Sequence, residues 1–385
     1  MTKLTEEIRA QAWQTGFDKV GISRAETLDE RSGLDAWLAR GQHGEMHWMG
    51  VDSAKRTNPL KVLAEAKSVI ALASNYYTPV QHSSQDVHGK ISRYAWAEDY
   101  HKVLKRRLAD LTRRIVKLEP AARGVYYSDT GPLMDKPWAH KGGIGWIGKH
   151  SNLITRTLGS WVFLGEILLN LELEYDREDR NYCGTCHRCI DACPTRAIIA
   201  PYVVDSRLCI SYLTIELRGA IPIELRRLVG NRIFGCDDCQ DVCPWNRFAQ
   251  PSSERAFYPP EYNRAPTLIS LMQMTESEFR ERFRNSAVRR AKYSGFLRNV
   301  AVALGNSKDP AAVPVLSDAV LRHSEPLVRA HAAWALGEIG DGRCIEILER
   351  ADECEADVSV TEEIRLALSK HHTLLPLQPD AESHG

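Results

Sequence analysis

Apolar and polar positions follow two different periods in the first part of the chain. Apolar residues recur at helical spacing over residues 4–15, 33–40, 60–66 and 99–118. Short apolar runs that predict strands lie between and after them, at residues 19–23, 68–73, 124–128 and 161–169. Because strands alternate with helices, we predict an α/β layered domain over residues 1–175.

The pattern changes after residue 175. Residues 176–250 are rich in Cys, Gly, Pro and Asp, which predicts little regular structure, and residues 251–285 are predicted to form a linker with helical parts. Farther on, Ala303-Leu304-Gly305 recurs as Ala335-Leu336-Gly337, a period of about 32 residues that is typical of stacked helix pairs. We therefore predict HEAT-like helical repeats over 286–373, packed on the rest of the protein, and a disordered tail at 374–385.

Composition is that of an ordinary globular chain. Hydrophobic residues make up 43% and charged residues 26% of the 385 positions. The first residues lack the basic and apolar regions of a signal peptide, and no apolar run approaches the roughly 18 residues of a membrane span. We therefore expect a cytoplasmic protein that does not enter a membrane, and we expect it to act as a monomer.

Charge is unevenly distributed, although the formal net charge is zero. Two segments, 101–117 and 280–298, contain one acidic residue each and many basic ones. The basic residues are Lys102, Lys105, Arg106, Arg107, Arg113, Arg114 and Lys117 in the first segment, and Arg280, Arg282, Arg284, Arg289, Arg290, Lys292 and Arg298 in the second. Such clusters can bind a polyanion, whereas the simpler interpretation is that they cover solvated helix faces.

Eight cysteines carry the most specific pattern in the chain. Cys183, Cys186, Cys189 and Cys193, followed by proline, have the spacing of the bacterial ferredoxin run, in which the fourth cysteine binds a second [4Fe–4S] cluster. The partner run, Cys236-x2-Cys239-x3-Cys243-Pro244, lacks its first cysteine, and Cys209 lies upstream to replace it. Crossing the fourth cysteines assigns one cluster to Cys183, Cys186, Cys189 and Cys243, and the other to Cys193, Cys209, Cys236 and Cys239.

Zinc and disulfides explain this pattern less well. Zinc also binds C-x2-C pairs but does not need two C-x3-C-P endings, and a cytoplasmic chain is not expected to form four disulfides. Two adjacent clusters conduct single electrons from an external donor to a site of chemistry, so we predict a redox protein. Cys344 and Cys354 lie in the repeats and are interpreted as ordinary helix cysteines.

Two features ahead of the cysteines could build the site of chemistry. Gly142, Gly143, Gly145 and Gly148 would let backbone approach a large flat or phosphate-bearing ligand, although their spacing is not that of a dinucleotide-binding motif. Asp129 follows a predicted strand and precedes a Gly-Pro turn. Its carboxylate either caps this turn or projects into a cleft as a proton donor, and the residues alone favour capping.

Taken together, these motifs resemble the epoxyqueuosine reductases, the family that completes queuosine synthesis in tRNA. The resemblance spans roughly residues 5–350. Besides both cysteine runs, it rests on Arg93-Tyr94-Ala95-x3-Asp99-Tyr100-His101, Asp129-Thr130-Gly131-Pro132, Gly143-Ile144-Gly145-Trp146-Ile147-Gly148-Lys149, Gly159-Ser160-Trp161-Val162-Phe163-Leu164-Gly165-Glu166, Arg207-Leu208-Cys209-Ile210-Ser211-Tyr212-Leu213-Thr214 and Gly230-Asn231-Arg232-x2-Gly235-Cys236-Asp237. Ala97 and His150 depart from the family pattern, which has glycine and asparagine there.

The resemblance implies a cobalamin-binding α/β domain joined to a ferredoxin-like module, with cob(II)alamin and two [4Fe–4S] clusters as cofactors. It also implies reduction of epoxyqueuosine to queuosine at the tRNA wobble position. The expected partners are the anticodon stem-loop of a tRNA that carries epoxyqueuosine and an external low-potential electron donor.

The resemblance further implies the site residues. Asp129 matches the family's proton donor, and we expect burial beside the corrin to keep it protonated. Positions near cobalamin in the family match Arg56, Asp129, Leu153, Leu164, Ser211, Ile215 and Asp237.

Two other functions fit part of the pattern. A reductive dehalogenase of small organohalides would use a corrin and clusters, but it predicts an export signal and leaves the HEAT-like repeats without a role. An electron-transfer adaptor would use the clusters alone and would not bind cobalamin.

Overall fold

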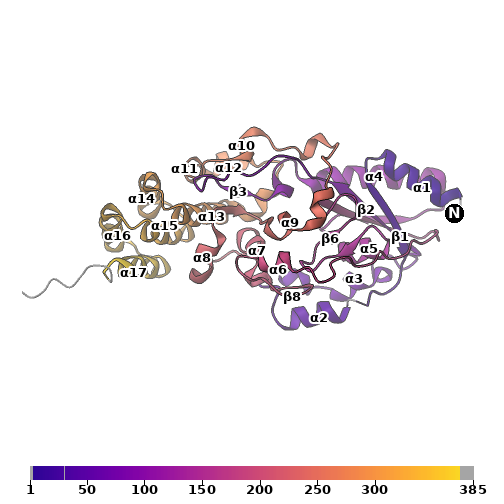
Figure 1. The fold of residues 1–385 in the computed structure, drawn as a ribbon, viewed down its shortest axis with the longest axis horizontal. Helices are drawn as coiled ribbons and strands as arrows, with labels where there is room; N and C mark the ends of the chain where they lie inside the picture. The colour runs from indigo at the N-terminus through magenta and orange to yellow at the C-terminus, as the bar shows by residue number, and fades with distance from the viewer. Residues whose placement is uncertain (1–2, 30, 373–385) are drawn as a thin grey trace, which may run out of the picture.

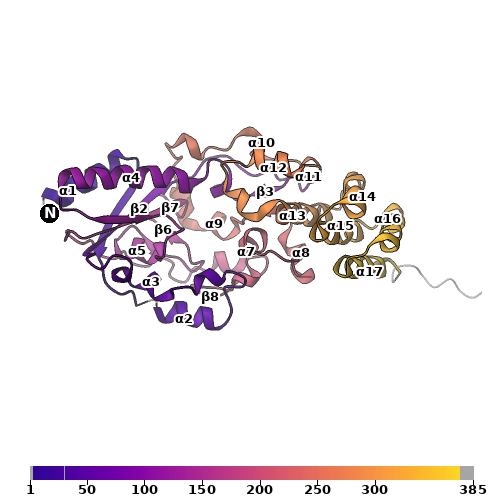
Figure 2. The ribbon, with the colours of Figure 1, turned by 180° about the vertical axis from the view of Figure 1, so that it is seen from behind.

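The computed structural model describes residues 3–29 and 31–372 and shows an elongated molecule (Figure 1). The sheet and its helices lie at one end, the cysteine-rich segment lies in the middle, and helices from the C-terminal part form the other end, as the reverse view also shows (Figure 2). The predicted tail at 374–385 lies outside the described residues. None of the described helices is long and apolar enough to cross a membrane.

Short elements dominate the middle of the chain and longer helices its C-terminal part. The strands are β1 (Lys19–Arg24), β2 (Ser68–Asn75), β3 (Lys90–Ile91), β4 (Gly124–Tyr127), β5 (Trp146–Ile147), β6 (Leu153–Ile154), β7 (Val162–Leu169), β8 (Ile198–Ala200), β9 (Val203–Val204) and β10 (Arg232–Phe234). The helices are α1 (Lys3–Gln14), α2 (Arg31–Ala39), α3 (Ser53–Thr57), α4 (Tyr100–Leu118), α5 (Asp135–Lys141), α6 (Arg188–Asp191), α7 (Ile210–Ile215), α8 (Ile223–Val229), α9 (Asp238–Asp241), α10 (Glu261–Arg264), α11 (Leu268–Met272), α12 (Glu276–Arg282), α13 (Lys292–Ser307), α14 (Val313–Arg322), α15 (Pro326–Ile339), α16 (Gly342–Cys354) and α17 (Val358–His372).

A four-stranded sheet with the order β1-β2-β7-β4 organises the first region, and its neighbouring strands are antiparallel. Helices cover both faces, which explains why β2 is buried along its whole length. Ile70 and Leu72 pack with the apolar faces of α1 and α4, whereas Ala71 and Ala73 face α5, as expected from the alternation of side chains along a strand. The predicted α/β layering is confirmed.

One predicted helix is absent. Residues 60–66 do not form a helix, because only a single 3-10 turn at Pro59–Lys61 follows Asn58. The Asn58 side chain accepts a hydrogen bond from the Leu60 N–H and starts the turn. Leu60 remains 41% exposed and Val62 and Leu63 are only partly buried, so apolar burial does little to extend the turn into a helix.

The cysteine-rich region contains more regular structure than we predicted. The segment after Cys209 forms α7 and α8, and β10 pairs in parallel with β3 from the first region. Residues 90–91 therefore belong structurally with the cysteine-rich region, although about 140 residues separate the two paired strands in the sequence.

The C-terminal helices form the predicted HEAT-like stack, in which α13, α15 and α17 pack in succession. The repeated glycines explain the close packing. A Cβ atom on Gly305 would lie 2.7 Å from the Trp334 ring, and one on Gly337 would lie 2.7 Å from the Ala367 Cβ. Only glycine permits this approach between helices.

Two buried arginines join the repeats to the cysteine-rich region. Arg298 on α13 is 1% exposed, and its guanidinium donates to the backbone carbonyls of Leu213, Leu217 and Gly219. Arg226 on α8 pairs with Glu363 on α17 through both of its terminal guanidinium nitrogens. These bonds satisfy buried charge and fix the stack to the rest of the molecule.

Candidate active site between the sheet and the cysteine-rich region

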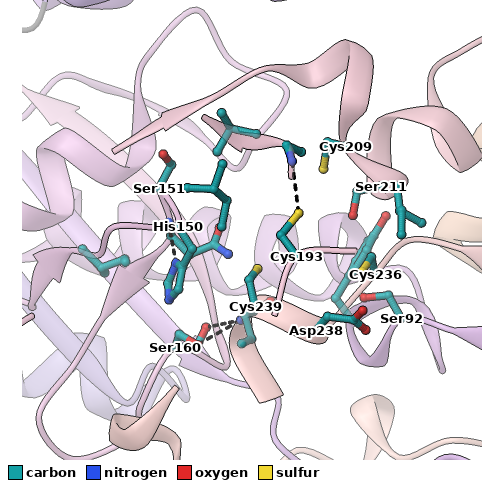
Figure 3. A pocket seen from close by; sticks show the side chains of 18 of the residues that line it. Ser92, His150, Ser151, Ser160, Cys193, Cys209, Ser211, Cys236, Asp238 and Cys239 are labelled. Carbon is teal, nitrogen blue, oxygen red and sulfur yellow. Dashed lines mark hydrogen bonds between the residues drawn. The ribbon is translucent and has the colours of Figure 1, made fainter. Parts of the chain in front are cut away.

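A cavity of about 440 Å³ lies between the sheet and the cysteine-rich region (Figure 3). The start of β7 provides an apolar wall at Val162, Phe163 and Leu164, and Tyr100 from α4 adjoins it. The other side carries Ser211 at the start of α7 and four cysteines, which are Cys193, Cys209, Cys236 and Cys239. The cavity has the size typical of a cofactor or substrate site.

The remaining four cysteines of the ferredoxin-like pattern line a second, smaller cavity. Cys183, Cys186, Cys189 and Cys243 surround it together with Tyr182 and Trp245. The structure thus brings the eight cysteines together in the two crossed sets, because Cys243 lies with the first run and Cys193 with the second. Within the described residues, no three His, Cys, Asp or Glu side chains converge on a point that would hold a single metal ion. Thiolates that stand around a volume suit a cluster better than one zinc ion.

Burial makes several of these thiols, among them Cys236, Cys239 and Cys243, poor acids without metal. It raises the pKa of Cys243 to about 11, and the neighbouring Cys183, Cys189 and Cys186 add to the shift. Burial also raises the pKa of Cys236 and Cys239 far above the usual range. Thiolates in these positions need the positive charge of bound iron to stay deprotonated.

His150 lies between the two cavities and lines both. Its Nδ1 accepts the Asn152 backbone N–H at 3.1 Å, so Nε2 carries the hydrogen of the neutral ring. Nε2 is buried and has no hydrogen-bond partner among the described residues. Burial lowers the pKa of His150 to about 4, which keeps the ring neutral. An N–H donor without a partner therefore lies at the boundary of the two cysteine sets, where sulfur acceptors would satisfy it.

Asp129 lies at the turn after β4, next to the cavity. Its φ angle is +61°, a left-handed conformation that is uncommon outside glycine. The carboxylate does not cap the turn: Oδ2 accepts from Tyr100 Oη at 2.7 Å and lies 3.2 Å from His101 Nε2. His101 Nδ1 in turn lies 2.7 Å from Asp99 Oδ1. Tyr100 lines the cavity, so it links Asp129 to the cavity wall.

The contacts of His101 and Asp129 favour a proton on the imidazole over one on the carboxylate. Burial raises the pKa of Asp129, but hydrogen bonds from His101 and Tyr100 outweigh it, and the pKa lies below its usual value. Burial lowers the pKa of His101, but contacts with Asp129 and Asp99 outweigh it and raise the pKa to about 9. The expectation that burial beside the corrin keeps Asp129 protonated concerns the loaded site and stays a prediction.

The expected cobalamin contacts divide into two groups. Leu153, Leu164 and Ser211 line the cavity, whereas Arg56, Asp129, Ile215 and Asp237 are not part of its lining. Arg56 donates to the backbone carbonyls of Met49 and Trp48. The Asp237 carboxylate accepts from Ser92 Oγ and the Arg93 N–H, and its neighbour Asp238 lines the cavity instead.

The glycine-rich segment has a different role from the one expected. A Cβ atom on Gly142 would lie 2.9 Å from the Gly21 carbonyl carbon, and one on Gly145 would lie 2.1 Å from the Ile154 carbonyl oxygen. These glycines let backbone pack against backbone in the protein interior, and they do not line the cavity.

The two basic segments meet beside this site. The Asp99 N–H donates to the Asn285 carbonyl at 2.7 Å, and Lys102 Nζ donates to the Asn285 side chain. Arg289, Arg290 and Lys292 are exposed and follow Asn285 closely. Not every cation is available, because Arg298 is buried, Arg107 pairs with Glu254 and Arg290 pairs with Glu216. We call Lys102, Arg289 and Lys292 the basic rim.

Sequence reasoning missed several residues of the site. His101 appeared only as part of a motif and as the first residue of a basic segment. Its position two residues after Asp99 and one after Tyr100 was the available signal. Glu166 likewise appeared only as the last residue of a motif. The available signal was a carboxylate inside an otherwise apolar strand.

Family models match three parts of the chain. One for epoxyqueuosine reductase QueG matches residues 56–130, one for a 4Fe-4S double cluster binding domain matches 182–246, and one for HEAT repeats matches 286–369. The second match shows the two-cluster [4Fe–4S] module that the cysteine spacing predicts.

Similar proteins cover nearly the whole chain. The epoxyqueuosine reductase of Pseudomonas aeruginosa is 42% identical over 347 residues, which are 88% of this chain and 95% of that protein. The Escherichia coli enzyme of the same name is 39% identical over 371 residues, 95% of each chain. Among solved structures, an epoxyqueuosine reductase in complex with an epoxyqueuosine-modified tRNA-Tyr stem loop has a TM-score of 0.90, at 33% identity over 96% of this chain and 99% of that one.

Proposed function

Because the chain belongs to the epoxyqueuosine reductase family, we propose that it reduces epoxyqueuosine to queuosine at the wobble position of tRNA, the last step of tRNA queuosine biosynthesis. One observation carries the proposal. A single cavity is lined by four cysteines of the crossed arrangement, and Tyr100 in its wall connects it to the Asp129–His101 pair. A source of electrons and a source of protons therefore adjoin one space, as the reduction of an epoxide to an alkene requires.

We propose cobalamin as the cofactor in this cavity. The apolar wall of Leu153, Val162, Phe163 and Leu164 suits a flat macrocycle, and Ser211 and Lys136 offer polar groups at its edge. When bound, cobalamin supplies a metal that takes electrons one at a time from a cluster and delivers two to the epoxide. Arg56, Ile215 and Asp237, which do not line the cavity, would act on such a ligand only from a second layer.

The crossed cysteine sets would give electrons a direction. We assign one [4Fe–4S] cluster to Cys183, Cys186, Cys189 and Cys243, and the other to Cys193, Cys209, Cys236 and Cys239. The second set lines the reaction cavity, whereas Gly184 and Thr185, between Cys183 and Cys186 of the first set, are exposed. An external low-potential donor would therefore reach the first cluster, and the second would face the substrate.

The protons would come through Asp129. His101 holds a proton at Nε2 and faces Asp129 Oδ2, so Asp129 can pass a proton to the epoxide oxygen and be reprotonated from His101. Protonation matters because the oxygen of the opened epoxide would otherwise be an alkoxide, which is a poor leaving group. The complete reaction consumes two electrons and two protons and releases water.

The basic rim would bind the tRNA. Phosphate contacts from clustered lysines and arginines hold nucleic acid beside the cavity, and an anticodon loop offers unstacked bases that can enter it. The complex of a similar epoxyqueuosine reductase with a modified tRNA stem loop supports this part of the proposal. We propose that the protein acts on tRNA in the cytoplasm, as a monomer.

The test is anaerobic turnover with tRNA that carries epoxyqueuosine. Protein loaded with iron, sulfide and cobalamin, and reduced with a low-potential donor, should yield queuosine-tRNA, whereas protein without cobalamin should not. Asp129→Asn should keep both clusters and the corrin absorption but lose turnover by about a hundredfold or more, because general acid catalysis contributes at least that much. Fully loaded wild-type protein that leaves epoxyqueuosine unchanged would refute the proposal.

A further inference from the structure

Two buried carboxyl groups, those of Glu166 and Asp135, lie under the turn that carries Asp129. Glu166 is 0% exposed and sits in the middle of β7. Its neighbours at even positions, Leu164 and Leu168, belong to the apolar clusters on the α5 side of the sheet, so Glu166 points toward α5 as well. Asp135 is the first residue of α5, and its carboxyl group meets that of Glu166 there.

Three of the four carboxyl oxygens of this pair are buried without a hydrogen-bond donor among the described residues. They are both carboxyl oxygens of Glu166 and Oδ1 of Asp135. Ionised carboxylates only accept hydrogen bonds, and two of them side by side repel. Their hydrogen bond therefore requires a proton on one of the pair.

The environment assigns that proton to Glu166. Burial raises the pKa of Glu166 well above its usual value, and the charge of Asp135 adds to the shift. Burial raises the pKa of Asp135 as well, but the hydrogen bond with Glu166 lowers it, which favours the proton on Glu166. The other charged or titratable groups that face the pair are Asp129, Lys136, Arg56 and Tyr100.

Asp135 connects the pair to the proposed proton donor. The Asp135 carboxylate accepts a hydrogen bond from the backbone of Asp129. Asp129 has a φ of +61°, a conformation that is uncommon outside glycine and is favoured here by any contact that holds the turn. A carboxylate that accepts the Asp129 N–H and is itself held by a protonated Glu166 provides such a restraint.

The corresponding loop moves in a relative. A solved epoxyqueuosine reductase from Bacillus subtilis, with a TM-score of 0.89 to this chain at 32% identity, is described with its catalytic aspartate loop swung out of the active site. A loop that adopts two positions needs a contact that favours the inner one.

We propose that Glu166 and Asp135 share one proton and that this shared proton holds the Asp129 turn in place beside the cavity. Both residues are positioning residues, because they act on the reaction through Asp129. The shared proton itself is independent of the proposed function, and only its consequence for turnover rests on that function.

Infrared spectroscopy tests the shared proton directly. At neutral pH the cluster-loaded wild-type protein should show the C=O stretch of a protonated carboxyl group, and Glu166→Gln should lack it. Glu172→Gln, an exposed position just beyond the end of the same strand, is the matched control and should keep the band. An unchanged band in Glu166→Gln would overturn the proposal.

Amide hydrogen exchange tests the restraint on the turn. A glutamine at 166 can still donate to Asp135, so Glu166→Gln should keep slow exchange at Asp129, whereas Glu166→Leu should speed it by about tenfold or more because a charged group loses its buried donor. In turnover, Glu166→Leu should lower kcat more than it raises KM, and Glu166→Gln should restore most of kcat. If the leucine variant does not fold, the infrared result still decides.

Exchange at Asp129 that is equally slow in Glu166→Leu and wild type would show that the pair does not hold the turn. Neither the infrared measurement nor the hydrogen-exchange measurement uses tRNA or cobalamin. A failure of the proposed function would therefore leave both results interpretable.

Discussion

Asp99 and Asp129 face the two ring nitrogens of His101, at 2.7 and 3.2 Å. An imidazole between two carboxylates is stabilised in its protonated form, which explains the pKa of about 9. Because this value lies above that of an unfolded histidine, the pairing stabilises the fold fully below about pH 6.5 and is lost as the pH rises through about 9.

The same pair predicts how turnover depends on pH. We expect kcat to fall as the pH rises through about 9, because Asp129 then loses its source of protons. His101→Gln should lower kcat at pH 7 and remove this alkaline limb, and a pH profile of single-turnover rates measures both. A variant with the wild-type profile would show that the proton comes from elsewhere.

His150 predicts an effect on reduction potential. Hydrogen bonds to cluster sulfurs are among the features that set the potential of an iron–sulfur cluster, and Nε2 of His150 is a buried donor at both cysteine sets. His150→Leu should shift the midpoint potential of at least one cluster to more negative values. His150→Asn, which keeps an N–H donor, should shift it less. Redox titration followed by electron paramagnetic resonance measures this, and unchanged potentials in the leucine variant would contradict it.

At the residue scale, spacing in the sequence was informative where several residues of one type act together. Eight cysteines reveal their pairing because a cluster needs four ligands at fixed intervals. Glu166 and Asp135 could not be paired in this way, because 31 positions separate them and only the packing of α5 on β7 brings them together. The lowered pKa of Asp129 could not be predicted from spacing either, because it depends on two donors from α4 that only the fold places.

At the scale of elements, two short helices hold the two cysteine sets side by side. α6 follows Cys186 and α9 follows Cys236, and the two helices pack against each other. After α6 the chain reaches the second set, where Cys193 lies with Cys236 and Cys239. After α9 it reaches the first set, where Cys243 lies with Cys183 and Cys186.

The crossing predicts which cluster each substitution damages. Cys243→Ser should disturb the cluster of Cys183, Cys186 and Cys189 and leave the other intact, although Cys243 follows Cys239 in sequence. Cys193→Ser should do the reverse. Iron content and the resonance spectra of the two reduced clusters distinguish these outcomes. If Cys243→Ser instead removes the cluster bound by Cys236 and Cys239, the crossed assignment is wrong.

Strands of the main sheet were predictable because a strand covered by helices on both faces is a continuous apolar run. The pairing of β3 with β10 was not, since two strands of two and three residues carry no periodicity of their own. Residues 60–66 show that a local start signal at Asn58 does not extend a helix when the first apolar residue after it, Leu60, stays exposed.

At the scale of the whole molecule, the basic rim combines segments that are far apart in the sequence. The contact of Asp99 and Lys102 with Asn285 brings the start of α4 to the segment before α13. A formal net charge of zero therefore conceals a local concentration of cations beside the cavity.

This arrangement predicts the salt dependence of tRNA binding. Lys102→Ala and Arg289→Ala should each weaken binding. Each should also reduce the magnitude of the slope of log K against log salt concentration by about 1, as expected for the loss of one phosphate contact. Lys117→Ala is the control, because Lys117 lies on the same helix roughly 22 Å from Lys102 at 1.5 Å per residue. This variant should bind tRNA as the wild type does. Equal losses in all three variants would place the interface elsewhere.

The most direct test of the account is whether cobalamin occupies the cavity between β7 and the second cysteine set. Ser211 lines that cavity, and a tryptophan there would fill space without removing a cysteine or Asp129. After anaerobic loading and gel filtration, wild-type protein should retain about one cobalt per chain with a corrin absorption spectrum, at the stoichiometry of a single site. Ser211→Trp should retain its iron but little or no cobalt. A Ser211→Trp protein that binds cobalamin as the wild type does would show that the cavity is not the cofactor site.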